Sequence, residues 1–96
     1  MAAQEMPIFT RTFDFLTWLI PATAHFPRAQ RFATTQRLQN AAFDLSERLQ
    51  EANARRQQAR LQQINLADEA LIKVRFYLRL THRWGWLSAS QYKHAA

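Results

Sequence analysis

The stretch RQQARLQQINLADEALIKVRFYLRLTHRW, from Arg56 to Trp84, decides the fold of this chain. It contains no Pro and no Gly, and it is rich in the residues that lose least rotamer freedom in a helix. Apolar residues recur in it at three- and four-residue steps and so share one helix face: Leu61, Ile64, Ala67, Leu71, Val74 and Leu78. A second apolar row lies beside the first: Leu66, Ala70, Tyr77 and Trp84. A helix with so wide an apolar arc must be covered by several neighbouring elements.

The rest of the composition agrees with a helical domain. The chain has 96 residues, with one Gly and three Pro, too few punctuating residues for a many-stranded fold. We therefore predict a disordered tail over residues 1–7 and a single all-α domain over residues 8–96. There is no Cys, which excludes disulfides and zinc–thiolate sites and favours a cytoplasmic location.

No membrane segment or secretory signal is predicted. The N-terminal residues lack a basic flank and a small-residue cleavage site. The most apolar run, from Phe13 to Ala24, is 12 residues long and contains Asp14 and Pro21. A membrane-spanning helix needs about 20 apolar residues.

The first two helices can be placed from their apolar rows. The first is predicted from Ile8 to about His25, with one core row and two residues that broaden it: Phe9, Phe13, Leu16 and Ile20, then Phe15 and Leu19. Pro21 lies inside this helix, where it should kink the last turns. The second is predicted to open with Pro27 as its first residue and to end near Asn53, with a core row of Leu38, Ala42, Leu45, Leu49 and Ala52.

The last two helices are placed by their caps. The third should end at Gly85, the only Gly in the chain. Ser88 and Gln91 have the spacing of a capping box, which predicts a short fourth helix from about Ala89 with Tyr92 facing inward.

Between the second and third helices the stop signal is weak. Asn53, which tolerates a left-handed cap, favours a tight hairpin over residues 53–56. The alternative is one continuous helix from Arg28 to Trp84, which would span about 85 Å without a sustained heptad pairing. We predict the hairpin, and hence an up-down-up-down four-helix bundle with two long central helices.

Positive charge is concentrated in this bundle. The formal net charge is +6, and eleven of the thirteen cations are Arg, whose planar fork suits phosphate and carboxylate groups. No acid lies between Asp14 and Asp44 or after Glu69. Folding the hairpin brings the second and third helices antiparallel, so cations from both should gather at one end. The candidate partner-binding residues are Arg28, Arg31, Arg37, Arg75, Arg79 and Arg83, with Lys73 level with Arg37.

The aromatic residues near this basic end have two interpretations. Trp84 and Trp86 can stack on exposed bases or anchor the chain turn in the core, and for Trp84 we favour the core. Phe32 and Phe43 fall outside the core row of the second helix. They are expected to contact the first helix, and the alternative is contact with another subunit.

An apolar patch should remain at the opposite end. The first helix is too short to cover the hairpin end of the second and third helices, which leaves Leu45, Leu49, Leu61 and Ile64 uncovered. Such a patch favours a closed homo-oligomer.

No catalytic constellation is evident. His25, His82 and His94 lie on three separate segments, and no His–carboxylate pair has ligand spacing. No nucleophile has an obvious base, and the lone Gly is not part of a phosphate loop. We expect a protein that is not an enzyme and that holds no metal and no cofactor.

Three segments carry a resemblance to a known family. They are FDFLTWLIPATAHFPRAQRF (13–32), RLQNAAFDLSERLQEAN (37–53) and ALIKVRFYLRLTHRWGWLSASQY (70–92). Their order and spacing resemble the Avd family, the accessory variability proteins of diversity-generating retroelements. The NIAEG-like segment of related bundles encoded within ribosomal RNA genes is absent here.

The resemblance implies a four-helix bundle that assembles into a pentameric barrel and has no catalytic activity. It implies binding to a reverse transcriptase and to its template RNA during mutagenic cDNA synthesis. The family's basic positions match Arg28, Arg31, Arg75 and Arg79, whereas Arg37 and Arg83 come from the charge distribution alone.

The alternative function is a scaffold bundle that binds an acidic protein or ribosomal RNA without a reverse transcriptase. An RNA-binding subunit should lose affinity steeply with salt, whereas a scaffold that binds only protein should show no RNA affinity.

Overall fold

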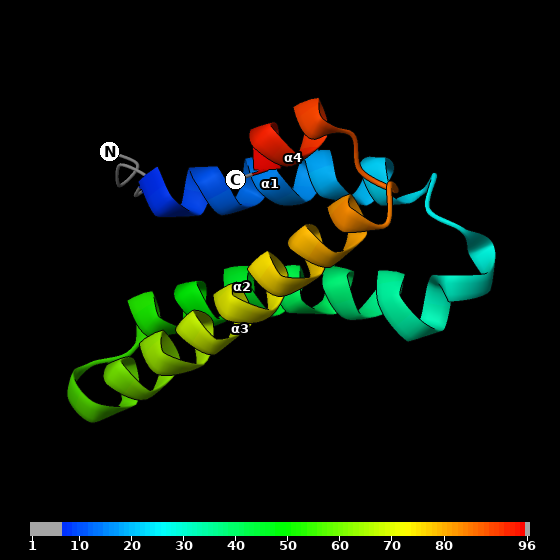
Figure 1. Ribbon diagram of the computed structural model, residues 1–96. Coiled ribbons are helices and arrows are strands. Elements are labelled where there is room, and N and C mark those ends of the chain that lie inside the picture. The colour runs from blue at the N-terminus through cyan, green and yellow to red at the C-terminus, as the bar shows by residue number, and fades with distance from the viewer. Residues whose placement is uncertain (1–6, 96) are drawn as a thin grey trace.

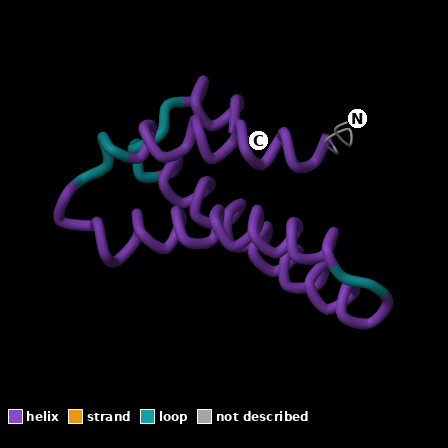
Figure 2. Tube along the Cα trace, turned by 180° about the vertical axis from the view of Figure 1, so that it is seen from behind, coloured by secondary structure: helices purple, strands orange, loops and turns teal. Residues whose placement is uncertain are grey.

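A computed structural model describes residues 7–95, and its regular elements are all helical. The four α-helices are α1 (Pro7–Thr23), α2 (Gln36–Ala54), α3 (Gln57–Arg83) and α4 (Ala89–Ala95). Successive helices run in opposite directions, with α2 beside α3 and with α1 and α4 near the C-terminal half of α3 (Figures 1 and 2). The prediction of an all-helical chain with two long central helices is confirmed. Most of the predicted tail, residues 1–6, lies outside the described residues, and Pro7 already belongs to α1.

A tight hairpin joins α2 to α3, as predicted, and the continuous helix is excluded. Arg55 and Arg56 have extended backbones, with φ of −116° and −134°. Gln57 follows with a φ of 53°, so the left-handed residue is Gln57 and not the predicted Asn53. The reason is that α2 continues past Asn53, and two extended residues then reverse the chain. Across the hairpin, Arg48 Nη1 donates a hydrogen bond to Gln63 Oε1 over 3.3 Å, which fixes the register of the two helices.

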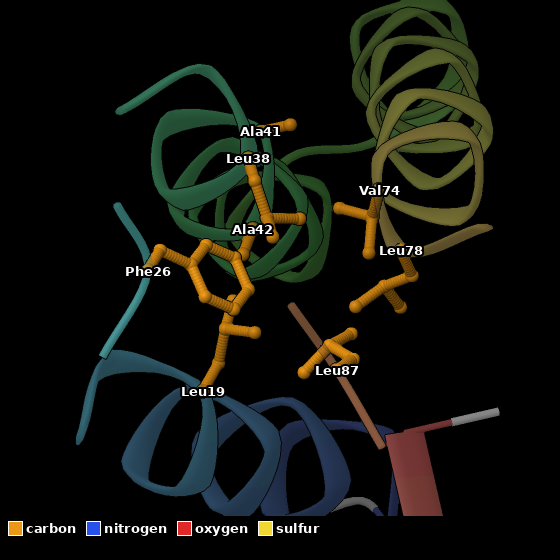
Figure 3. Packing of buried hydrophobic residues seen from close by; sticks show 8 residues of the cluster. All are labelled: Leu19, Phe26, Leu38, Ala41, Ala42, Val74, Leu78 and Leu87. Atoms are coloured by element: carbon orange, nitrogen blue, oxygen red, sulfur yellow. The ribbon is translucent and has the colours of Figure 1, made fainter. Parts of the chain in front are cut away.

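The hydrophobic core has two parts. The larger part lies where α1, α2, α3 and the segment before α4 meet, and its side chains point toward a shared interior (Figure 3): Leu19, Phe26, Leu38, Ala41, Ala42, Val74, Leu78 and Leu87. The smaller part lies toward the hairpin and contains Leu45, Ala67 and Ala70. The alanines in both parts carry little bulk, which lets α2 and α3 approach closely. The predicted core row of α2 is confirmed, with Leu49 half-buried and its other members buried.

The predicted core row of α1 is partly wrong. Phe13 is 68% exposed, whereas Leu19, Thr12 and Thr23 are buried. The two threonines can be buried because their hydroxyls bond to carbonyls of their own helix: Thr12 to Phe9 over 3.1 Å and Thr23 to Ile20 over 2.9 Å. The other members of the predicted row, Phe9, Leu16 and Ile20, are half-buried, so the error is confined to Phe13 and to the buried threonines, which apolar spacing does not reveal.

The start of the second helical segment also differs from the prediction. Pro27 precedes the segment as its N-cap, with φ −56° and ψ 129°, instead of being its first residue. A 3-10 turn, η1 (Arg28–Gln30), and a π turn, η2 (Arg31–Thr35), then lead into α2. These two turns curve away from the line of α2 at the right of Figure 1. The predicted single regular helix from Pro27 is therefore replaced by three kinds of helical turn.

The end of α3 has the hydrogen bonds of a Schellman cap. The Trp86 N–H bonds to the Thr81 carbonyl over 2.9 Å, and the Gly85 N–H bonds to the His82 carbonyl over 3.0 Å. Gly85 has a φ of 82°, a conformation that L side chains rarely adopt. The predicted ending at the only Gly is confirmed.

Helix α4 opens with the predicted capping box. The Ser88 N–H donates to Gln91 Oε1 over 2.9 Å, and the Gln91 N–H donates to Ser88 Oγ over 3.1 Å. The Tyr92 ring is half-buried and stacks on His82, with ring centroids 4.5 Å apart and planes inclined by 1°. The inward orientation predicted for Tyr92 is therefore confirmed.

Among the described helices, none is both long enough and apolar enough to cross a membrane.

Candidate nucleic-acid interface

Three aromatic rings lie together where α1 ends and α3 ends. The Phe26 and Trp86 centroids are 5.4 Å apart, and the Trp86 and Trp84 centroids are 4.9 Å apart. Phe26 is buried, Trp86 is half-buried and Trp84 is 48% exposed. We call Phe26, Trp84 and Trp86 the aromatic tip. The prediction that Trp84 belongs to the core is wrong, because the cap of α3 places Trp86 in the inner position instead.

Two predicted arginines lie on the chain that leaves the aromatic tip. Arg28 opens η1 and Arg31 opens η2, and both side chains are exposed. Phe32, next to Arg31, is 76% exposed, and Phe43 on α2 is also exposed. The exposure of Phe32 leaves little of its side chain for the expected packing against α1, and contact of Phe32 and Phe43 with another subunit stays a prediction.

Two other predicted arginines lie along a groove between α1 and α3. Arg75 and Arg79 line it together with Arg11 of α1, around a cavity of about 540 Å³. We call this the arginine groove. Thr12 and Tyr92 also line it, and its apolar lining comes from all four α-helices: Ile8, Phe15, Leu45, Leu71, Val74, Leu78 and Ala95. An apolar cleft with a few converging charged groups is the usual form of a binding site.

The last two predicted arginines lie apart from these two groups. Arg37 is exposed in the first turn of α2, and Arg83 is exposed at the end of α3, next to Trp84. The Arg48–Gln63 hydrogen bond places Arg37 level with Val74, one residue from Lys73, when each helix is followed toward the aromatic tip. The register expected for Arg28 and Arg31 assumed a regular helix, which η1 and η2 do not provide.

None of the six predicted arginines is neutralised by a carboxylate in the part of the chain that the structure describes. In residues 7–95 the single ion pair joins Arg48 to Glu51 over 3.5 Å, toward the hairpin end. The arginine groove, and the chain on either side of the aromatic tip, therefore carry guanidinium groups that are free to bind an anion.

Arg11 was not among the residues predicted from the sequence. It precedes Thr12, which is buried, and follows the start of α1 by one helical turn. The available signal was its position four residues before Phe15, since residues at that spacing share a helix face. Because apolar spacing does not reveal that Thr12 is buried, Arg11 was not placed beside Arg75 and Arg79.

Two of the three histidines make contacts with neighbouring groups. His82 Nδ1 lies 3.1 Å from the Leu87 carbonyl oxygen, and its ring stacks on Tyr92. The His94 ring lies 5.0 Å from the Trp18 ring. Across residues 7–95, no three His, Asp or Glu side chains are grouped so as to hold a metal ion.

Comparison with known protein families, with curated proteins and with solved structures found no match to this chain.

Proposed function

We propose that this chain is a non-catalytic accessory protein of a diversity-generating retroelement, which binds the reverse transcriptase and its template RNA. Two independent arguments support the proposal. The order and spacing of the segments over residues 13–32, 37–53 and 70–92 resemble the Avd family. The all-helical fold, with two long central helices, is compatible with the bundle that this family forms.

The observation that carries RNA binding is the set of exposed arginines without carboxylate partners on α1, η1, η2 and α3. Guanidinium groups bind phosphate in a two-pronged geometry and remain charged at all physiological pH values. RNA presents one phosphate per nucleotide, so a surface of spaced arginines matches it without reading its sequence.

The first prediction concerns salt. If the six predicted arginines contact phosphates, the logarithm of the RNA association constant should fall linearly with the logarithm of salt concentration, with a slope of about −4 to −5. Filter binding of a structured RNA over a series of salt concentrations measures this slope. A slope near zero, or no binding even at low salt, would contradict the RNA-binding part of the proposal.

The proposed assembly is a closed homo-oligomer, a pentamer in the family that this chain resembles. Of the predicted apolar patch, Leu61 and Ile64 are exposed and Leu49 is half-buried, whereas Leu45 is buried by α3. Ile72 and Phe76 extend the exposed apolar row along α3. A row of this length on one helix is typical of a subunit interface.

The second prediction concerns mass. Light scattering at micromolar concentration should give a mass well above the 11.3 kDa of one chain, and about 57 kDa for a pentamer. Replacement of Leu61 and Ile64 by Asp should shift the protein to the monomer, because it places charge on the proposed interface. A single species of 11.3 kDa for the unaltered chain would exclude the oligomer.

One observation favours the alternative, a scaffold that binds an acidic protein. The arginine groove combines an apolar floor with three guanidinium groups, which fits an amphipathic helix carrying carboxylates. In that case Arg75→Glu combined with Arg79→Glu would abolish capture of the protein partner. Neither the unaltered protein nor the double variant would show RNA affinity.

A further inference from the structure

Trp84 is exposed, whereas the other two rings of the aromatic tip are buried or half-buried. Trp84 is 48% exposed, whereas Phe26 and Leu87, which belong to the same end of the core as Trp86, are buried. Leaving a large aromatic ring in water forfeits burial energy that a small domain needs. An exposed Trp at a fixed position therefore suggests a binding partner for its ring.

The ring of Trp84 is held in place by its surroundings. The backbone N–H of Trp84 donates to the Leu80 carbonyl over 3.0 Å, and the Schellman cap fixes the two residues that follow. Its ring packs against Trp86 at an inclination of 56°, and Trp86 in turn packs against buried Phe26 at 55°. The three rings thus form a series of tilted contacts that ends on a buried ring, and binding to Trp84 would immobilise little that is not already ordered.

The charge around Trp84 is positive. Arg83 precedes it in the sequence, and Arg28 lies two residues after Phe26, whose ring contacts Trp86. Neither Arg28 nor Arg83 pairs with a carboxylate of residues 7–95. An exposed Trp84, with Arg83 next to it in the sequence and Arg28 on the segment that leaves Phe26, matches a ligand that has a flat aromatic group next to a phosphate.

We infer that Trp84 is a stacking platform for an unpaired base of single-stranded RNA, with Arg28 and Arg83 contacting the adjoining phosphates. This inference rests on the proposed RNA binding and names the form of RNA that the aromatic tip selects. In a duplex the bases are already stacked on each other, so a protein ring cannot reach their faces. Stacking on an aromatic ring accepts any base, so no sequence preference is expected.

The test compares a short oligouridylate with a duplex RNA of equal length, by fluorescence anisotropy at fixed salt. Trp84→Ala should weaken binding of the oligouridylate about tenfold and leave duplex binding unchanged. Trp84→Phe, which keeps an aromatic face, should retain most of the affinity. Trp84→Leu keeps an apolar contact with Trp86 but offers no aromatic face, so it should lose as much affinity as Trp84→Ala.

Phe13→Ala is the matched control, since Phe13 is an exposed aromatic residue on α1 that lies outside the aromatic tip. It should bind both RNAs as the unaltered protein does. Binding of the oligouridylate should also quench tryptophan fluorescence in the unaltered protein, and less so in Trp84→Phe.

The results separate this inference from the proposed function. Equal affinities of Trp84→Leu and the unaltered protein for the oligouridylate would overturn the platform, as would equal losses on both RNAs. If the duplex binds and the oligouridylate does not, the platform fails while RNA binding stands. If neither RNA binds at low salt, both fail.

Discussion

Leu38→Ala should destabilise the protein by about 3 kcal/mol. Leu38 has no exposed surface, and it lies in the core cluster to which α1, α2 and α3 all contribute (Figure 3). Its neighbours Ala41 and Ala42 are too small to fill the cavity that the substitution leaves. A domain of this size has a total stability near the lower end of about 5–15 kcal/mol, so most of it would be lost. Thermal unfolding followed by circular dichroism should show a midpoint lowered by about 12 to 24 °C.

Leu61→Ala is the control for this prediction. Leu61 is 51% exposed on α3, so the same chemical change should cost no more than about 0.5 kcal/mol in the monomer. The measurement is made at concentrations where light scattering finds single chains, because Leu61 belongs to the proposed subunit interface. Similar costs for the two substitutions would contradict the position of Leu38 in the core.

Arg75→Glu combined with Arg79→Glu should weaken RNA binding by about 25- to 60-fold at about 0.1 M salt. Both residues line the arginine groove without a carboxylate partner among the described residues. Each lost phosphate contact removes about 0.7 to 0.9 from the slope of log K against log salt, so the slope should become shallower by about 1.4 to 1.8. Anisotropy titrations at several salt concentrations measure both quantities.

The matched control is Arg55→Glu combined with Arg56→Glu at the hairpin. Each pair of substitutions replaces two positive charges by two negative ones, so both variants have the same net charge. Arg55 and Arg56 are exposed and lie at the far end of α3 from Arg79. Equal losses of RNA affinity in the two variants would mean that net charge, and not the arginine groove, attracts the RNA.

The parts of the fold that local chemistry determines could be predicted from the sequence. The Gly85 cap and the Ser88–Gln91 box depend on hydrogen bonds between residues that are close along the chain, and both form as expected. The core row of α2 was predicted correctly because polar residues separate most of its apolar residues, so one face of the helix is far more apolar than the rest. In α1 almost every position from Phe13 to Ile20 is apolar, so spacing could not decide which side is buried.

The candidate site was only partly predictable, for a similar reason. The cation-rich segments were evident from the missing acids, but which arginines share a surface depends on how α1 lies against α3. Arg11 joins Arg75 and Arg79 through that packing, which no local pattern encodes. Either Trp84 or Trp86 could have faced the core, and the geometry of the Gly85 cap turns Trp86 inward and leaves Trp84 exposed.

The π turn of η2 contains one residue more than an α turn needs, so the chain can change length there. A π turn spans five residues where an α turn spans four, so removal of one residue, such as Ala33, would let this segment close as an ordinary α-helix. Each α-helical residue rotates the chain by about 100°, so Arg28 and Arg31 would swing round to another side. The buried residues that follow, from Leu38 onward, would keep their places. Changes of length at this point can therefore redirect the two arginines while the interior stays intact, a route by which related chains could acquire different ligands.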